Sequence, residues 1–333
     1  MLFKKISAWA NIVMAVIRKD RQWRFSLPIF SVLAAIALDL LLPRSIDQKT
    51  VAHPYFSWFL AITLGVYLFL YFARGESSWR EYARYRAPFY AGVTLLANVV
   101  NLLTAKLAVL PVLYFPAPDR VLAVLAEDTA YLATCVLYSC RLLFIGWTLG
   151  ALIGICTGVL LGFSKTASYW ITPFIRSLGP IPPTAWIPLV LVVFPTVVSG
   201  SVFLIGLSVW FPTAVLTNSG IANIKNSYFE MASTLGAGRF FQIFRIGLPA
   251  ALPSVFLGLF NGTCSSFITL VTAEMLGARY GLGWYINWQK EMMAYANVYA
   301  GLILIAVSFS CIITGLFRIR NRLLIWQKGV VKW

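Results

Sequence analysis

The chain has 333 residues, of which 60% are hydrophobic, 15% aromatic and 11% charged. A soluble domain carries about 25% charged residues, so this composition excludes a soluble globular protein and predicts an integral membrane protein. Lys and Arg number 27 against 11 Asp and Glu, which gives a formal net charge of +16. Because these cations lie mostly in short loops between apolar stretches, they indicate orientation in a bilayer, and we expect no nucleic-acid partner.

Side chains that usually carry catalysis or metal binding are scarce. His53 is the only histidine, and it has no acidic or Cys neighbour at ligand spacing. The five cysteines form no C-x-x-C pair. The stretch 158–166, GVLLGFSKT, lacks the Gly-Lys-Ser/Thr arrangement of a phosphate-binding loop. We therefore expect no catalytic residue, no metal site and no cofactor bound by this chain.

Long apolar runs with at most one charged residue can each cross the hydrocarbon core as a helix. Such runs predict an all-α membrane protein with about eight transmembrane helices, at 26–42, 56–72, 88–114, 135–163, 171–194, 198–220, 248–276 and 298–317. Lys106, Arg141 and Arg176 fall inside these runs, and near the run ends we expect them to snorkel to the interface. For Asp39 we expect a structural role, at the interface or paired with a neighbouring span.

The distribution of cations predicts the orientation. Nineteen of the 27 lie in the N-terminal segment, the C-terminal segment and the loops of one side, against five in the loops of the other side. The positive-inside rule then places both termini in the cytoplasm. Residues 1–24 carry apolar residues at helical spacing and predict an amphipathic helix in the membrane interface, the alternative being a solvated, partly disordered tail.

Proline and glycine interrupt two of the predicted spans. They cluster in 179–183, Gly-Pro-Ile-Pro-Pro, and again at Phe211-Pro212. An interior proline removes a helical hydrogen bond, so the freed carbonyl must find protein or a water-filled cavity. Such breaks are typical of segments along which a solute passes, and a packing kink is the alternative.

The segment 221–247, IANIKNSYFEMASTLGAGRFFQIFRIG, is too polar to span and too apolar to be disordered. Residues 228–235 predict a short helix that Gly236 ends, because glycine takes the left-handed conformation without a side-chain clash. A second helical stretch follows from Arg239. Pro249 then stands near the start of the next span, where a helix tolerates a residue without an amide hydrogen.

The pattern Glu230-x-Ala232-x3-Gly236-x9-Ile246-x-Leu248-Pro249 resembles the EAA loop of ABC importer permeases. One departure is Met231, where the family commonly has the first alanine. The resemblance covers about residues 88–333. This stretch is similar to permeases of the nitrate/sulfonate/taurine/bicarbonate branch of type I importers. Its other matches are the Pro-rich stretch 173–189, Ser139-x-Arg141 with Gly146, Phe211-Pro212, the stretch 248–253, Glu274-Met275-Leu276-Gly277-Ala278 and Gly281-Leu282-Gly283.

The resemblance implies a permease subunit in the bacterial cytoplasmic (inner) membrane, surrounded by lipid. It implies a second permease copy, identical or a close paralogue, two ABC ATPase subunits that hold ATP and Mg²⁺, and an extracytoplasmic substrate-binding protein. The cargo would be a small solute such as an oxyanion or a sulfonate-like compound. Glu230 would anchor the coupling helix through hydrogen bonds, or act as a solvated charge that favours the helix dipole. The coupling residues would be Glu230, Ala232, Gly236, Ile246, Leu248 and Pro249.

The family core has fewer spans than this chain, so the resemblance divides the sequence into three parts. Residues 1–24 would be the amphipathic cytoplasmic segment. Residues 25–87 would hold two extra transmembrane helices and a basic loop, and residues 88–333 the permease core with the coupling loop 221–247. The extra helices would pack around the core, recruit an accessory protein or stabilise the dimer.

The predicted span 248–276 is rich in small polar residues. Hydroxyl and amide groups line a water-filled route without the desolvation penalty of charges, and helix packing is the alternative. The candidates for lining are Asn261, Thr263, Ser265, Ser266, Thr269 and Thr272.

An ion-coupled secondary transporter or channel is the competing function. Ion coupling normally uses ionisable groups near the membrane midplane, and the acidic residues in the spans, Asp39 and Glu274, lie near predicted external ends. An intramembrane enzyme is a third class, which the lack of a catalytic histidine and of an acidic pair disfavours.

Overall fold

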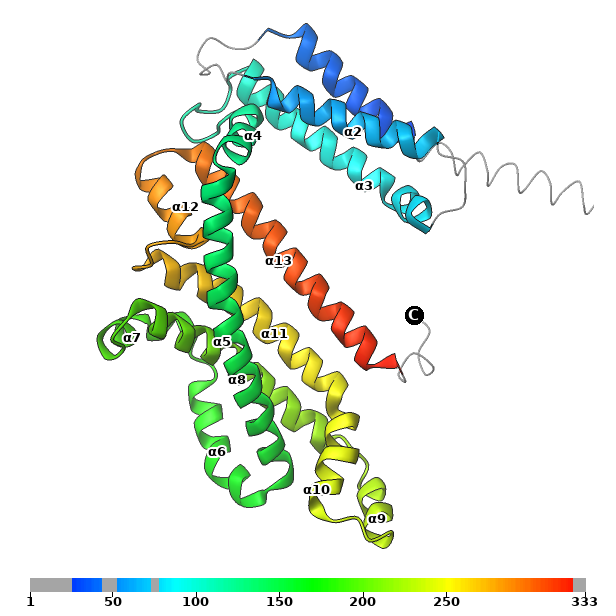
Figure 1. Cartoon of the computed structure of the whole chain (residues 1–333), viewed down its shortest axis with the longest axis vertical. Coiled ribbons are helices and arrows are strands. Elements are labelled where there is room, and N and C mark those ends of the chain that lie inside the picture. The colour runs from blue at the N-terminus through cyan, green and yellow to red at the C-terminus, as the bar shows by residue number, and fades with distance from the viewer. Residues whose placement is uncertain (1–25, 44–52, 73–77, 326–333) are drawn as a thin grey trace, which may run out of the picture. The chain divides into compact units, whose positions relative to one another are not determined.

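The computed structural model describes residues 26–43, 53–72 and 78–325 (Figure 1). All regular secondary structure in these ranges is helical, which confirms the all-α class. The amphipathic helix expected in 1–24 lies outside the described residues.

Six helices among the described residues are long and apolar enough to cross a membrane. They are Tyr55–Phe72, Glu81–Lys106, Thr129–Phe163, Val197–Ala222, Arg239–Met275 and Tyr295–Leu323. Two shorter apolar helices, Ser26–Leu41 and Pro183–Val193, fall within the remaining two predicted runs. Eight spanning helices are therefore not confirmed.

The run 171–194, expected to cross as one span, is divided. It consists of α6 (Lys165–Leu178), a 3₁₀ turn (Pro183–Trp186) and α7 (Ile187–Val193). Three prolines within 180–183 lack an amide hydrogen, so they cannot donate the backbone hydrogen bonds that would continue α6. The structure therefore confirms the expected break at this segment, whereas α8 (Val197–Ala222) continues as a helix through Pro212.

The described residues form two compact units, those up to residue 129 together with 293–300, and residues 130–292 together with 301–325. The described part of the first unit contains the helix Ser26–Leu41, α2 (Tyr55–Phe72), α3 (Ser78–Asn101) and α4 (Pro118–Glu127). Its core is a cluster of apolar side chains from the helix Ser26–Leu41 and α2: Val32, Ala35, Phe56 and Leu60.

A buried ion pair lies inside the first unit. Lys106 Nζ lies 3.1 Å from Asp39 Oδ1, and the two side chains are 3% and 7% exposed. The ammonium also donates to the carbonyls of Asp39 at 2.7 Å and Leu42 at 2.8 Å, at the C-terminal end of the first described helix. The other donors to Asp39 are Ser57 Oγ at 2.7 Å and Asn101 Nδ2 at 3.2 Å. Asp39 therefore has its expected structural role through pairing, with Lys106 as its partner, and the snorkelling of Lys106 to the interface stays a prediction.

Lys106→Gln should destabilise the first unit by about 3–5 kcal/mol, because it leaves the Asp39 carboxylate buried without its cation. Thermal unfolding of the purified chain in detergent measures the effect. The double variant Asp39→Asn/Lys106→Gln should recover much of the loss, since it buries no charge. Equal losses in the single and double variants would contradict the pairing.

The second unit contains α5 (Thr129–Phe163) from its second residue onward, α6, α7, α8, α9 (Asn226–Thr234), α10 (Arg239–Phe241), α11 (Leu248–Met275), α12 (Leu282–Glu291) and most of α13 (Tyr295–Leu323). Its core includes a cluster from α5, α8 and α11: Leu142, Leu143, Ile205, Phe267 and Leu270. Phe267 of α11 stacks on Phe309 of α13, with ring centroids 3.8 Å apart.

Glycines on α5 let α8 approach closely. They recur at every fourth residue and so lie along one helix face: Gly146, Gly150, Gly154, Gly158 and Gly162. A Cβ at Gly154 would lie 2.8 Å from Thr213 Cβ, and one at Gly158 would lie 2.5 Å from Thr217 Cβ. On α11, a Cβ at Gly258 would likewise lie 2.9 Å from the Cα of Thr213. We call the five α5 residues the glycine ladder; it fits the preference of membrane helices for small residues at their interfaces.

Candidate coupling site and solute cavity

The predicted short helix is α9, and it ends where the sequence indicates. Gly236 has φ +80°, a conformation that glycine takes without strain. Its amide donates to the carbonyl of Ser233 at 3.0 Å, and the amide of Ala237 donates to the carbonyl of Ala232 at 2.9 Å. These two bonds form a Schellman motif, which satisfies the last carbonyls of α9 and stops the helix sharply.

After this stop the chain enters one continuous helical run, Arg239–Met275. The run includes a π-helical turn at Gln242–Gly247, in which the amide of Leu248 donates to the carbonyl of Ile243 five residues back. Pro249 lacks an amide hydrogen, and its ring would clash with a carbonyl four residues earlier, so the wider turn accommodates it. The expectation that the span begins at Leu248 is corrected to a helical run that begins at Arg239.

Side chains fix α9 against this run. Gln242 Nε2 donates to Ser233 Oγ at 2.9 Å and to the carbonyl of Ala237 at 3.1 Å. Phe229 of α9 packs edge-on against Phe163 at the end of α5, with ring centroids 5.8 Å apart. A Cβ at Gly247 would collide with the same Phe163 ring. Phe163 therefore connects α9 and the π-helical turn to α5, a role that the sequence alone did not indicate.

The predicted coupling residues differ in exposure. Ala232 is buried, whereas Glu230 and Gly236 are exposed; Ile246, Leu248 and Pro249 are half-buried. Large apolar side chains around them are also exposed, with Leu235 88% and Phe240 80% accessible. We call this set the α9–α10 apolar surface: Tyr228, Met231, Leu235, Phe240 and Phe244. Large exposed apolar side chains gathered on one short segment are candidates for an interaction site.

A cavity of about 330 Å³ lies where the two proline-containing segments meet. A Cβ at Gly179 would collide with the ring of Phe211, so the two segments are in contact. Two of the six polar candidates on α11, Asn261 and Ser265, are among the lining residues. The remaining lining is Leu178, Gly179, Ile181, Pro182, Pro183, Trp186, Phe203, Leu207, Ser208, Trp210, Phe211 and Pro212.

The other four candidates on α11 hydrogen-bond within or beside their own helix. Thr263 is buried; its hydroxyl donates to the carbonyl of Leu259 at 2.6 Å and accepts from Trp147 Nε1 at 2.8 Å. The hydroxyls of Ser266, Thr269 and Thr272 each donate to a carbonyl of α11. This geometry is that of helix packing, and a pathway role for these four residues stays a prediction.

Three of the matched motifs come together at the opposite end of α11 from α9 (Figure 1). Glu274 is 0% exposed; its Oε1 accepts from Ser139 Oγ of α5 at 2.7 Å, and its Oε2 accepts from the amide of Gly283 at 2.8 Å. Ser139 Oγ in turn accepts from the amide of Leu282 at 2.9 Å. Gly281 has φ +130° and leaves no room for a Cβ beside the carboxylate. The network therefore ties α5 and α11 to the first turn of α12.

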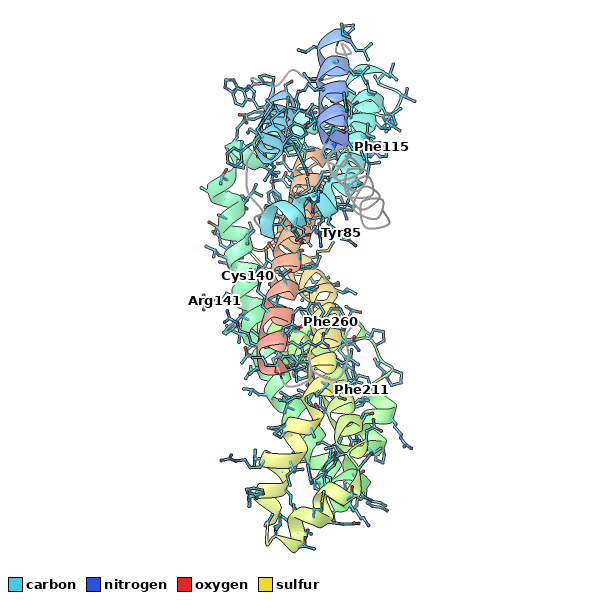
Figure 2. The ribbon with its side chains drawn as sticks, turned by 90° about the vertical axis from the view of Figure 1, so that its right-hand side faces the viewer. Tyr85, Phe115, Cys140, Arg141, Phe211 and Phe260 are labelled. Atoms are coloured by element: carbon cyan, nitrogen blue, oxygen red, sulfur yellow. The ribbon has the colours of Figure 1, made fainter. Side chains whose placement is uncertain are left out.

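The two remaining cations of the predicted spans differ in position. Arg141 is exposed, and Figure 2 shows it on the outer side of α5. Arg176 lies in the last turn of α6, before the proline-rich break, and lines a polar cavity.

Residues 150–324 match the family described as binding-protein-dependent transport system inner membrane component. The taurine transport system permease protein TauC of Escherichia coli is 29% identical over 74% of this chain and 94% of that protein. The putative aliphatic sulfonates transport permease protein SsuC of Bacillus subtilis is 31% identical over 56% and 67% of the two chains. The nitrate import permease protein NrtB of Synechococcus elongatus is 34% identical over 50% and 63%.

The fold also matches a chain of the MetNI methionine ABC transporter, solved in an inward-facing conformation. The TM-score is 0.51 with 19% identity, over 59% of this chain and 98% of that chain. The likeness shows a shared fold. Together with the six apolar helices, these matches make the protein a multi-pass inner membrane protein. The chain belongs to the family of binding-protein-dependent transport system inner membrane components, the ABC importer permeases, in the nitrate/sulfonate/taurine/bicarbonate branch.

Proposed function

We propose that this chain forms the translocation pathway of an ATP-driven importer and couples to two ATPase subunits through α9. ATP and Mg²⁺ are held by those subunits. The pathway is completed by a second permease copy, identical or a close paralogue, and an extracytoplasmic binding protein delivers the solute. Both termini lie in the cytoplasm, a placement that the excess of cations in the terminal segments and alternate loops supports.

The observation that carries this proposal is the construction of the coupling segment. α9 is short and sharply stopped at Gly236, and Gln242 and Phe163 fix it to the next helical run and to α5. A partner that grips the α9–α10 apolar surface therefore moves a rigid element connected to two long helices. Movement of the ATPases on binding ATP is passed to the spans by such a rigid-body shift.

The cavity beside the proline-rich break supports a solute route at this place. Its lining residues are uncharged, and Asn261 and Ser265 offer hydrogen-bonding groups in a wall of aromatic and aliphatic side chains. Neutral dipoles ease the passage of a polar solute without holding it as tightly as a fixed countercharge. The relatives are named for taurine, aliphatic sulfonates, nitrate and bicarbonate, and we propose an oxyanion or sulfonate-like compound as the cargo.

We further propose that the helix Ser26–Leu41 and α2 are additional to the permease core of residues 88–333. The family match begins at residue 150, and the matched solved chain aligns over 59% of this chain. The buried pair of Asp39 and Lys106 joins the first described helix to the π-helical turn that follows α3, Leu102–Lys106, so these additions pack as part of an ordered unit.

Reversing the charge of Glu230 and enlarging Gly236 should weaken ATPase docking. Glu230→Lys places a cation on the docking helix, and Gly236→Val forces a β-branched residue into a left-handed conformation that it rarely adopts. A loss of about 2 kcal/mol, typical of an interface hot spot, corresponds to about 30-fold weaker docking. Copurification with the candidate ATPase and ATP-dependent uptake into liposomes measure the effect.

The matched control is Glu291→Lys, which reverses an exposed carboxylate on α12. It should leave ATPase docking unchanged. If Glu230→Lys and Gly236→Val dock and transport as the control does, α9 is not the coupling helix. If uptake proceeds without ATPase subunits and follows an ion gradient, the chain is instead a secondary transporter or channel.

A further inference from the structure

A second cavity, distinct from the proposed solute route, lies between the end of α5 and the length of α6. Its volume is about 850 Å³. The lining includes two cations, three hydroxyl-bearing residues and a tyrosine: Lys165, Arg176, Ser168, Thr172, Ser177 and Tyr169. Neither the coupling segment nor the solute cavity uses the two cations.

The polar lining of α6 is a single stripe. Lys165, Ser168, Thr172 and Arg176 stand at positions i, i+3, i+7 and i+11, which fall on one face of a helix. The hydroxyls of Ser168 and Thr172 are 3.2 Å apart and form a hydrogen bond. A rise of 1.5 Å per residue places the two cations about 16 Å apart along the axis. The stripe therefore has a cation at each end and hydroxyls between.

The two cations are available to an external anion. The ion pairs among the described residues join Arg84 to Glu81 and Lys106 to Asp39, and neither Lys165 nor Arg176 forms one with a described carboxylate. Both line an open cavity in which long cationic side chains can reach toward each other.

A different part of the α6 surface is aromatic. Tyr169, Trp170 and Phe174 are all exposed, and Tyr169 also borders the cavity. Tyr and Trp are enriched where a membrane meets water, and a helix that combines such residues with cations suits the membrane interface. A free anion would use only the cations, whereas a lipid also uses the aromatic side chains beside its acyl chains.

We propose that the cavity between α5 and α6 binds the headgroup of an anionic membrane lipid. Lys165 and Arg176 contact its phosphate oxygens, and the hydroxyl of Ser168 or Thr172 donates to the headgroup between them. A lipid with two phosphates, such as cardiolipin, engages both ends of the stripe, so it binds more tightly than a lipid with one phosphate. Basic pockets beside membrane helices suit such headgroups.

The test is native mass spectrometry of the purified full chain in neutral detergent, titrated with cardiolipin, phosphatidylglycerol or phosphatidylcholine. The wild-type chain should bind cardiolipin most tightly and phosphatidylcholine least. The variant Lys165→Gln/Arg176→Gln should bind cardiolipin about 25-fold more weakly, because each of the two cations contributes about fivefold. The matched control Arg279→Gln/Lys290→Gln removes two cations elsewhere in the second unit and should bind as the wild type does.

The variant Lys165→Arg/Arg176→Lys keeps both charges and should retain cardiolipin binding, which separates loss of the site from misfolding. Equal binding of cardiolipin and phosphatidylcholine by the wild type would overturn the proposal, as would equal cardiolipin binding by the Gln variant and the control. Displacement of cardiolipin by millimolar inorganic phosphate would also overturn it, since the cavity would then be a site for free phosphate.

Discussion

Replacing Glu274 with alanine is expected to destabilise the second unit by about 2–6 kcal/mol, because it leaves two buried hydrogen-bond donors without their acceptor. The carboxylate is completely buried and accepts from Ser139 Oγ and from the amide of Gly283. Without it, both donors lose their acceptor in the interior, at about 1–3 kcal/mol for each unsatisfied group. Thermal unfolding in detergent and the yield of monodisperse protein measure the effect.

Companion variants separate the network from general damage to α11. Glu274→Gln keeps one acceptor oxygen and should lose less stability than alanine. Ser139→Ala removes a donor to the carboxylate and the acceptor of the Leu282 amide, so its effect should not add to that of Glu274→Ala. Glu291→Ala, on the exposed surface of α12, should change stability by less than about 0.5 kcal/mol. A Glu274→Ala variant as stable as Glu291→Ala would show that the network does not hold α12.

The sequence predicted those parts of the site whose cause is local. Gly236 stops α9 because a left-handed residue is needed directly after the helix. The break after α6 follows from prolines that lack amide hydrogens. Both effects act within a few residues of the chain. For this reason the expected short helix at 228–235 and the observed α9 at Asn226–Thr234 differ by at most two residues.

Features that depend on a partner distant in sequence were not predictable in the same way. Lys106 is the last residue of a π-helical turn, Leu102–Lys106, that follows α3, and it pairs with Asp39. An apolar run in the sequence gives no sign of such a turn. The six polar residues of α11 formed one group in sequence. Asn261 and Ser265, which are four residues apart, share the face that lines the cavity, whereas the hydroxyl of Thr263 bonds Trp147 of α5. The neighbouring helices determine which face of α11 lines the cavity and which face packs against α5.

The four-residue spacing of the glycine ladder is visible in the sequence. The sequence does not show that α8 is the helix that packs against it. Gly158→Leu should be strongly destabilising, because a Cβ there would lie 2.5 Å from Thr217 Cβ and 2.7 Å from the carbonyl oxygen of Ala214. The backbone of α8 cannot move aside as a flexible side chain does, so α5 and α8 must separate. Overpacking costs about 1–3 kcal/mol even where side chains can adjust, and we expect a loss at or above the top of this range in thermal unfolding.

The matched control is Gly92→Leu in α3, where an added Cβ meets no atom within 4 Å. It should be nearly neutral. Thr217→Gly removes the side chain that Gly158→Leu strikes, so the double variant should regain part of the stability. If Gly158→Leu unfolds at the temperature of Gly92→Leu, the close approach of α5 and α8 is absent. Because Phe163 follows the ladder and contacts α9, separating α5 from α8 should also reduce ATP-dependent uptake more than it reduces ATPase docking. This result would show that the glycine ladder keeps α5 in place against α8, so that α5 can follow the movement of α9. The α9–α10 apolar surface would be unchanged in such a variant.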